Sequence, residues 1–86
     1  MPYGRNDLPR FFFHIDDHIH EIDDEGQEFA DAAAARVQAI IYAGELLRDD
    51  PGLVWDGQRL EVRVTDEAGM PVIAVQITAV DAEPEA

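Results

Sequence analysis

Hydrophobic and polar residues alternate in three stretches of the chain, at residues 10–15, 59–65 and 70–79. Because the side chains of a β-strand point alternately to opposite faces, each stretch is predicted to be a strand with one buried face. The residues expected on the buried face are Phe11, Phe13, Ile15, Leu60, Val62, Val64, Ile73, Val75 and Ile77. The opposite face is expected to carry Phe12, His14, Val72, Ala74 and Gln76.

Turn-forming residues join these strands into two predicted hairpins. A pair of Asp residues follows the first strand, and residues 18–22 are expected to return as a short second strand. The sequence DEAG at residues 66–69 is typical of the connection between two antiparallel strands. A further turn is expected near Gly26, before Phe29 brings the chain back to the core.

The segment from residue 32 to residue 50 has the spacing of a helix. Asp31 is a good N-cap, and Pro51 should end the helix by Asp50. One stripe recurs at steps of three and four residues and is expected to face the sheet; it consists of Ala33, Val37, Ile40, Ile41, Gly44 and Leu47. Gly44 suggests a close approach of the helix to the surface that it covers. Trp55, between the helix and the next strand, is expected to close the core, or otherwise to anchor a partner.

The order of these elements is β-β-α-β-β, which predicts a two-layer α+β fold with one helix packed on one face of an antiparallel sheet. The 86 residues suit one small domain, with an ordered core at about residues 10–79. The termini, residues 1–8 and 81–86, are expected to be frayed.

Charge narrows the range of partners. Nineteen acidic residues against six Arg and no Lys give a net charge of −13. Such a surface repels phosphate and anionic lipid, so we expect no direct binding to nucleic acid or membrane, whereas a basic patch on another protein is a plausible partner. The sequence has no apolar leader and no apolar run near the ~20 residues of a membrane span, so a cytoplasmic location is expected.

The densest cluster of potential metal-binding or catalytic side chains is HIDDHIHEIDDEGQE at residues 14–28. Its candidate metal ligands are His14, His18, His20 and Asp16, which are ligand types that suit zinc, nickel or manganese. Their spacing does not complete a tetrahedral site, and the run misses the calcium-loop template. Charged residues on an edge strand also have a simpler role, which is to discourage strand addition.

Motifs of catalysis are missing from the sequence. It contains no Cys, no G-x-G-x-x-G, no phosphate-binding G-x-x-x-x-G-K-[ST] loop and no H-E-x-x-H. We therefore expect a protein that is not an enzyme and needs no cofactor.

Four short motifs resemble a known family. They are FFH at residues 12–14, DDEG at residues 23–26, the Ala-rich helix, and VRVTDEAG at residues 62–69. Together they are similar, over roughly residues 10–78, to a family of short bacterial proteins recorded only as a domain of unknown function. The first turn of this chain lacks the Gly that the resemblance leads us to expect after the Asp, and His20 is extra. The resemblance implies the fold and supplies no activity.

Three hypotheses for function follow. The first is a non-catalytic, small acidic interaction module, a homodimer that uses the uncovered sheet face or an edge strand of the last hairpin. Its candidate interface residues are Phe12, Val72 and Ala74. The second is an acidic adaptor or antitoxin-like protein that docks on a basic partner protein. The third is a metal-binding protein that uses the His/Asp-rich hairpin.

Overall fold

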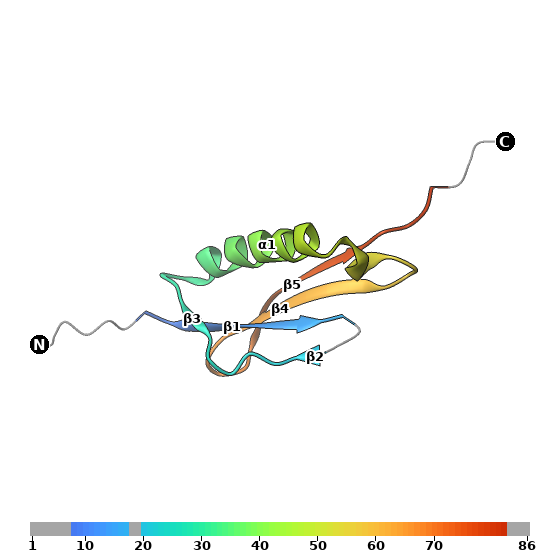
Figure 1. Ribbon diagram of the computed structural model, residues 1–86. Helices are drawn as coiled ribbons and strands as arrows, with labels where there is room; N and C mark the ends of the chain where they lie inside the picture. Colours follow the sequence, from blue (N-terminus) through green and yellow to red (C-terminus); the bar gives the residue numbers. More distant parts are fainter. Residues whose placement is uncertain (1–7, 18–19, 83–86) are drawn as a thin grey trace, which may run out of the picture.

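One helix lies over one face of an antiparallel sheet (Figure 1). The computed structural model describes residues 8–17 and 20–82. The strands are β1 (Arg10–Asp16), β2 (His20–Glu21), β3 (Gln27–Glu28), β4 (Arg59–Thr65) and β5 (Pro71–Thr78). The helices are α1 (Ala32–Asp49) and a short 3-10 helix, η1 (Pro51–Val54). The predicted two-layer α+β fold is confirmed, with β3 and η1 as additions.

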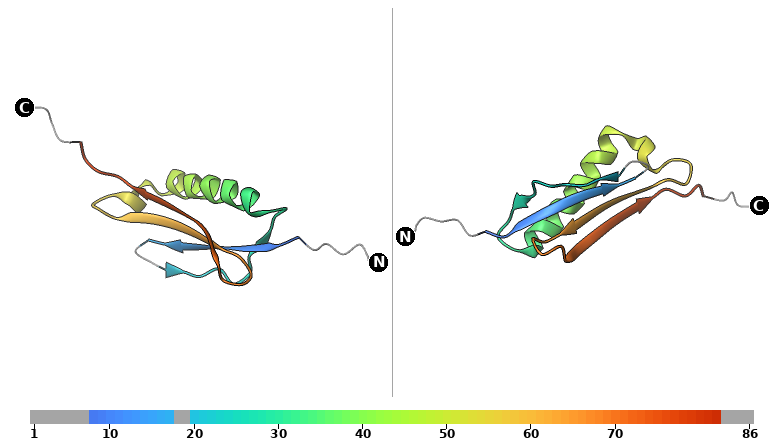
Figure 2. Two further views of the ribbon diagram at one scale, coloured as in Figure 1. Left: turned by 180° about the vertical axis from the view of Figure 1, so that it is seen from behind. Right: turned by 90° about the horizontal axis from the view of Figure 1, so that it is seen from below.

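The sheet has the order β2-β1-β4-β5, and β3 also pairs with β1 (Figure 2). The predicted return strand at residues 18–22 is present as β2, although residues 18–19 lie outside the described part of the chain. The pairing of β3 with β1 was not expected from the sequence. As a result, β5 forms one edge of the sheet, and β2 and β3 lie along the other. We call residues 20–28, which contain β2, β3 and the acidic turn between them, the return segment.

The core consists of apolar residues that lie opposite one another on neighbouring strands. Val64 lies between Phe13 of β1 and Ile73 of β5, and Val62 lies between Ile15 and Val75. Val62 and Val64 are fully buried, as is Leu60. The alternation read from the sequence therefore predicts the buried face of the sheet correctly.

An irregularity in β5 moves one expected residue to the other face. Val64 pairs with Ile73 but Thr65 pairs with Pro71, so Val72 is an extra residue on β5. Bulges of this kind break the strict alternation of side chains. Val72 accordingly packs against the buried core, and its expected place on the uncovered face was wrong.

The ends of α1 follow the sequence closely. The Asp31 carboxylate accepts a hydrogen bond from the backbone N–H of Ala34 at 2.9 Å, as expected for an N-cap. The helix ends at Asp49, immediately before the Asp50-Pro51 pair. Both predicted boundaries are confirmed.

The buried side of α1 differs from the expected one. The residues that face the sheet are Ala35, Ala39 and Ala43, all at most 1 % exposed. Val37 and Ile40 are each 58 % exposed and Ile41 is 47 % exposed, so the stripe expected to be buried is mostly exposed. Of its members, Leu47 does pack against the core. Small Ala side chains allow the helix to lie close to β4. The larger side chains that fill the core come from the sheet, at Leu60, Val62 and Val64.

Gly44 and Trp55 also differ from expectation. A Cβ added at Gly44 meets no heavy atom within 4 Å, so this glycine faces open space and not the sheet. Leu53 and Val54 turn into the core through η1, whereas Trp55 is 66 % exposed. The expectation that Trp55 closes the core was therefore wrong.

Candidate functional site

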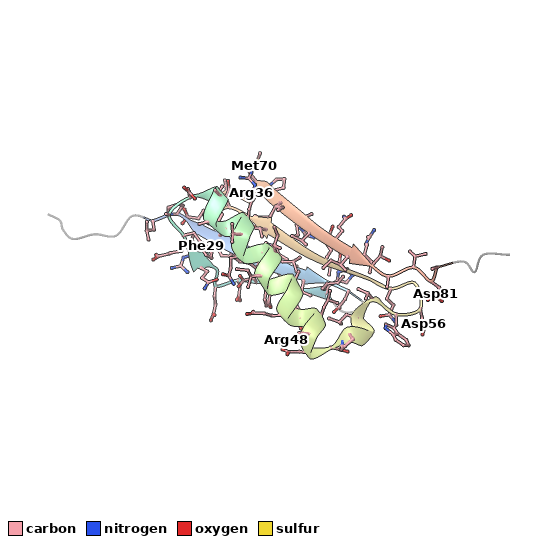
Figure 3. The ribbon with its side chains drawn as sticks, turned by 90° about the horizontal axis from the view of Figure 1, so that it is seen from above. Phe29, Arg36, Arg48, Asp56, Met70 and Asp81 are labelled. Atoms are coloured by element: carbon pink, nitrogen blue, oxygen red, sulfur yellow. The ribbon has the colours of Figure 1, made fainter. Side chains whose placement is uncertain are left out.

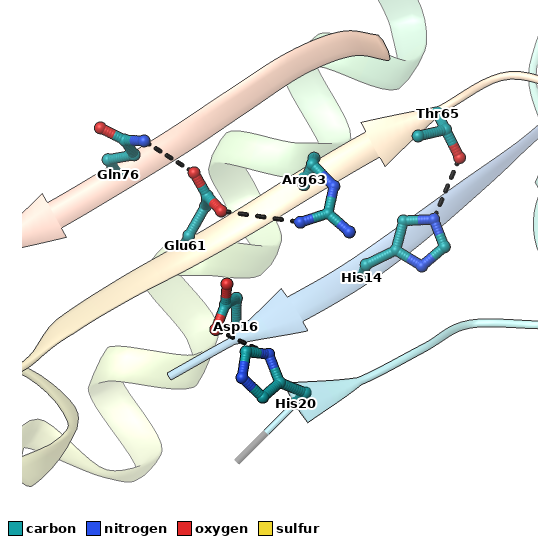
Figure 4. Close-up of polar contacts among 7 residues, drawn as sticks. All are labelled: His14, Asp16, His20, Glu61, Arg63, Thr65 and Gln76. Carbon is teal, nitrogen blue, oxygen red and sulfur yellow. Dashed lines mark hydrogen bonds and ion pairs between the residues drawn. The ribbon is translucent and has the colours of Figure 1, made fainter. Parts of the chain in front are cut away.

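His14 connects three of the sequence motifs on the face of the sheet away from α1. The backbone N–H of Asp23 donates a hydrogen bond to His14 Nδ1 at 3.2 Å. On the other side of the ring, His14 Nε2 lies 3.0 Å from Thr65 Oγ1 (Figure 4). Because Nδ1 accepts a hydrogen bond, Nε2 carries the hydrogen when the ring is neutral, and this N–H donates a hydrogen bond to the Thr65 hydroxyl oxygen. Both ring nitrogens are therefore engaged in holding β1, the 23–26 turn and β4 together.

Asp23 is the second residue of this connection. Its Oδ2 accepts from the backbone N–H of Phe13 at 3.0 Å, and its Oδ1 accepts from Glu25 and Gly26 at 3.0 and 3.1 Å. Partial burial alone would raise the pKa of Asp23, but these three backbone donors and the nearby His14 hold it below its ordinary value. The carboxylate therefore fastens the return segment to β1.

Gly26 is the third residue, and its conformation excludes a side chain. Its φ is +73°, and an added Cβ would lie 2.8 Å from the Arg10 side chain, 2.9 Å from the Phe11 carbonyl oxygen and 2.9 Å from the Phe12 ring. The turn must therefore approach β1 closely. We call His14, Asp23, Gly26 and Thr65 the motif hub.

The structure does not bring the candidate metal ligands together. His14 is engaged in the motif hub, while His20 Nδ1 pairs with Asp16 Oδ1 at 3.0 Å. His18 lies outside the described residues. Within residues 8–17 and 20–82, no group of three or more His, Asp or Glu side chains is arranged to hold a metal ion.

The uncovered face of the sheet is largely occupied by polar contacts. Gln76 donates to Glu61 Oε2 at 2.6 Å, and Arg63 lies 3.7 Å from Glu61 Oε1 (Figure 4). Of the candidate interface residues, Ala74 is exposed on this face, whereas Phe12 is half-buried beside Gly26. Val72 packs against the core instead. Of these three candidates, Ala74 is therefore the one that is exposed on this face.

A groove of about 390 Å³ lies between α1, β1 and the return segment. Its lining includes Phe13 and Tyr42, whose rings meet edge to face at 6.5 Å, and four acidic residues, Glu21, Asp23, Asp24 and Glu25. Burial, and then the carboxylates of Glu21, Asp23 and Glu45, raise the pKa of Tyr42, so its hydroxyl keeps its proton. The groove thus combines an aromatic wall with a negative rim.

A second surface lies at the opposite edge of the molecule. Tyr42 packs on Phe13 of β1, and Ile40 precedes it by two residues, about 200° around the helix, so Ile40 is turned towards β5. Gly44 lies about 40° from Ile40 around the helix, and Val37 and Ile41 lie about 60° and 100° from it, on the side of α1 that faces away from the sheet. We call β5 together with Val37, Ile40, Ile41 and Gly44 the apolar flank. Arg36 borders it near the start of β5, where Met70 lies (Figure 3).

The sequence comparisons agree with the motifs. The family model of DUF6894, a domain of unknown function, matches residues 10–78, and the chain belongs to this family. The match spans β1 to β5 and so includes the whole motif hub. Searches of curated proteins and of solved structures gave no significant match. No helix within the described ranges is both long and apolar enough to cross a membrane.

Proposed function

We propose that this protein is a non-catalytic interaction module that forms a homodimer through the apolar flank. The observation that carries the proposal is the exposure of Val37, Ile40 and Ile41 on α1, with Ile40 on the side of the edge strand β5. Contiguous apolar surface of this kind marks protein–protein contacts. A chain of 86 residues also gains stability by burying such surface against a partner.

The motif hub supports a structural role for the family motifs. His14, Asp23 and Thr65 use their side chains to join strands and a turn, and Gly26 permits the close approach. The motifs therefore build the scaffold, and the proposed contact surface lies on the other side of the molecule.

The mass of the protein in solution tests this proposal. We expect light scattering behind a sizing column to give about twice the chain mass of 9.6 kDa at tens of micromolar. Ile40→Asp should halve the measured mass, because it places a charge in the middle of the flank while disturbing little of the core. Ile22→Asp is the matched control, because Ile22 is 70 % exposed but lies on the acidic side, and it should leave the dimer intact.

A wild-type mass of one chain across this concentration range would overturn the proposed homodimer. A dimer that survives Ile40→Asp but is lost in Ile22→Asp would move the interface to the acidic side. Raising salt from 50 to 200 mM should change the mass little, because an apolar contact is not screened.

The acidic groove favours a second candidate function, docking on a basic partner protein. Its rim carries four acidic residues, and its aromatic wall could hold the aliphatic part of an Arg or Lys side chain. Binding of this kind should weaken steeply over the same rise in salt, which distinguishes it from the dimer.

A further inference from the structure

We propose that the two copies join along β5, so that the two sheets become one continuous antiparallel sheet with both α1 helices on the same face. This inference rests on the proposed function and specifies the partner and the geometry: the occupant of the β5 edge is the β5 strand of a second copy. A two-fold axis perpendicular to the sheet relates the copies.

The edge of β5 lacks the usual protection against strand addition. Edge strands normally carry charged residues, Pro or bulges. The eight residues of β5, PVIAVQIT, contain no Asp, Glu, Lys or Arg, although the chain as a whole has 25 charged residues. Pro71 and the register irregularity at Val72 both lie at the start of the strand, so Ile73–Thr78 remains open to pairing over roughly 20 Å.

The position of the axis follows from the strand itself. Pro71 has no N–H to donate and Val72 is the extra residue of the register irregularity, so the segment available for regular pairing is Ile73–Thr78. Its inward apolar residues, Ile73, Val75 and Ile77, are centred on Val75. Residues opposite each other must point to the same face, so the axis has to pass beside a residue and not between two. An axis at Val75 places Ile73 opposite Ile77 of the other copy on the face beneath the helices.

The helices fit the same arrangement. α1 lies over β4 and β5, and neighbouring strands are ~4.8 Å apart, so the two copies of α1 would run antiparallel roughly 10–14 Å apart. Packed helices lie 8–10 Å apart depending on their side chains. Ile40, which is turned towards β5, would lie between them, and Gly44, about 40° farther round the helix and with open space around it, permits a close approach.

The distribution of the acidic residues and the size of the chain's surface are compatible with a second copy as the occupant. Residues 16–31 carry eight acidic residues and no Arg or Lys. Within this range, β2 and β3 lie along the edge opposite β5. Pairing at β5 therefore keeps the two acidic edges at the far ends of the dimer. A stable interface needs ~800 Å² from each partner, which is about an eighth of the 6042 Å² surface of this chain. A strand edge and a helix side lying one above the other are suited to supply it.

Cysteine crosslinking tests the pairing, because the natural chain has no Cys. With the axis at Val75, residue 74 of one copy lies opposite residue 76 of the other, at a distance that a disulfide can span. Ala74→Cys and Gln76→Cys both change exposed positions of β5. Under mild oxidation, an equal mixture of the two variants should form a mixed disulfide several-fold faster than either variant alone. Arg63→Cys, next to Ala74 but on the inner strand β4, is the matched control and should stay uncrosslinked.

The outcomes separate this inference from the proposed function. A dimer by light scattering without crosslinking at residues 74 and 76 would overturn the paired sheet and leave the homodimer standing. Crosslinking of one variant with itself, in preference to the mixture, would overturn the axis at Val75. A monomeric mass would overturn both proposals.

Discussion

Gly26→Ala should be among the most damaging single substitutions in this protein, with a melting temperature roughly 10–20 °C lower than that of the wild type. The left-handed backbone at φ +73° costs an L-residue about 1–2 kcal/mol, and a Cβ within 3 Å of three atoms of β1 adds a steric cost of about 1–3 kcal/mol. Thermal unfolding followed by far-ultraviolet circular dichroism measures the change.

Gly57→Ala is the matched control for this prediction. Gly57 has a φ of +78°, close to that of Gly26, but its added Cβ meets no heavy atom within 4 Å. Its loss should therefore be confined to the backbone strain, and the difference between the two variants isolates the contact with β1. Equal losses in the two variants would contradict the close approach of the 23–26 turn to β1.

Asp23→Asn should lower the melting temperature at neutral pH by about 5–10 °C, as expected for a loss of about 1–2 kcal/mol. The substitution replaces one carboxylate oxygen by an amide that cannot accept, while backbone donors of Phe13, Glu25 and Gly26 surround the site. Asp24→Asn removes the same charge from an exposed neighbour and should have little effect. Thermal unfolding of both variants makes the comparison.

The effect of Asp23→Asn should also depend on pH. Because the folded protein lowers the pKa of Asp23, the ionised carboxylate stabilises the fold above the ordinary pKa of 3.8. This stabilisation is lost as the pH falls through the lowered pKa of the folded state. The difference in melting temperature between wild type and Asp23→Asn should therefore shrink as the pH falls below 3.8 and through the lowered pKa of Asp23. A difference that stays constant down to pH 2 would contradict the assigned role.

The strands were predictable because each of them has one buried face. A sheet covered on one side imposes a period of two, which the sequence shows directly at Leu60, Val62 and Val64. The exception is Val72, whose side chain lies on the opposite face from the expected one. The register irregularity that causes this is not visible in the local sequence pattern. The pairing of β3 was also out of reach, because a two-residue strand has no period.

The buried side of α1 was not predictable from hydrophobicity, because two stripes on the helix have helical spacing. The more hydrophobic one, which contains Val37 and Ile40, is exposed, and the smaller one, Ala35, Ala39 and Ala43, is buried. The signal that could have distinguished them is size: a helix that lies on a sheet already filled by Leu and Val needs small residues at the contact. A hydrophobic stripe left over in this way is itself an indication of a partner surface.

The candidate site could be predicted only as a set of motifs. The sequence identifies His14, the DDEG turn and Thr65 as parts of a resemblance, but the contacts among them join residues up to 51 positions apart. Such contacts depend on the register of β1 against β4, which the sequence does not specify. The same contacts assign His14 to the scaffold and not to the metal site considered for it.

Hydrogen exchange along β5 tests the central claim most directly, because strand pairing protects the outer amides of an edge strand, whereas a dimer that uses only α1 leaves them without a partner strand. We predict that alternate amides between Ile73 and Thr78 exchange slowly in the wild type at tens of micromolar and rapidly in Ile40→Asp. Rapid exchange of all the outward amides in both proteins would contradict the claim that β5 is the seam of a dimer.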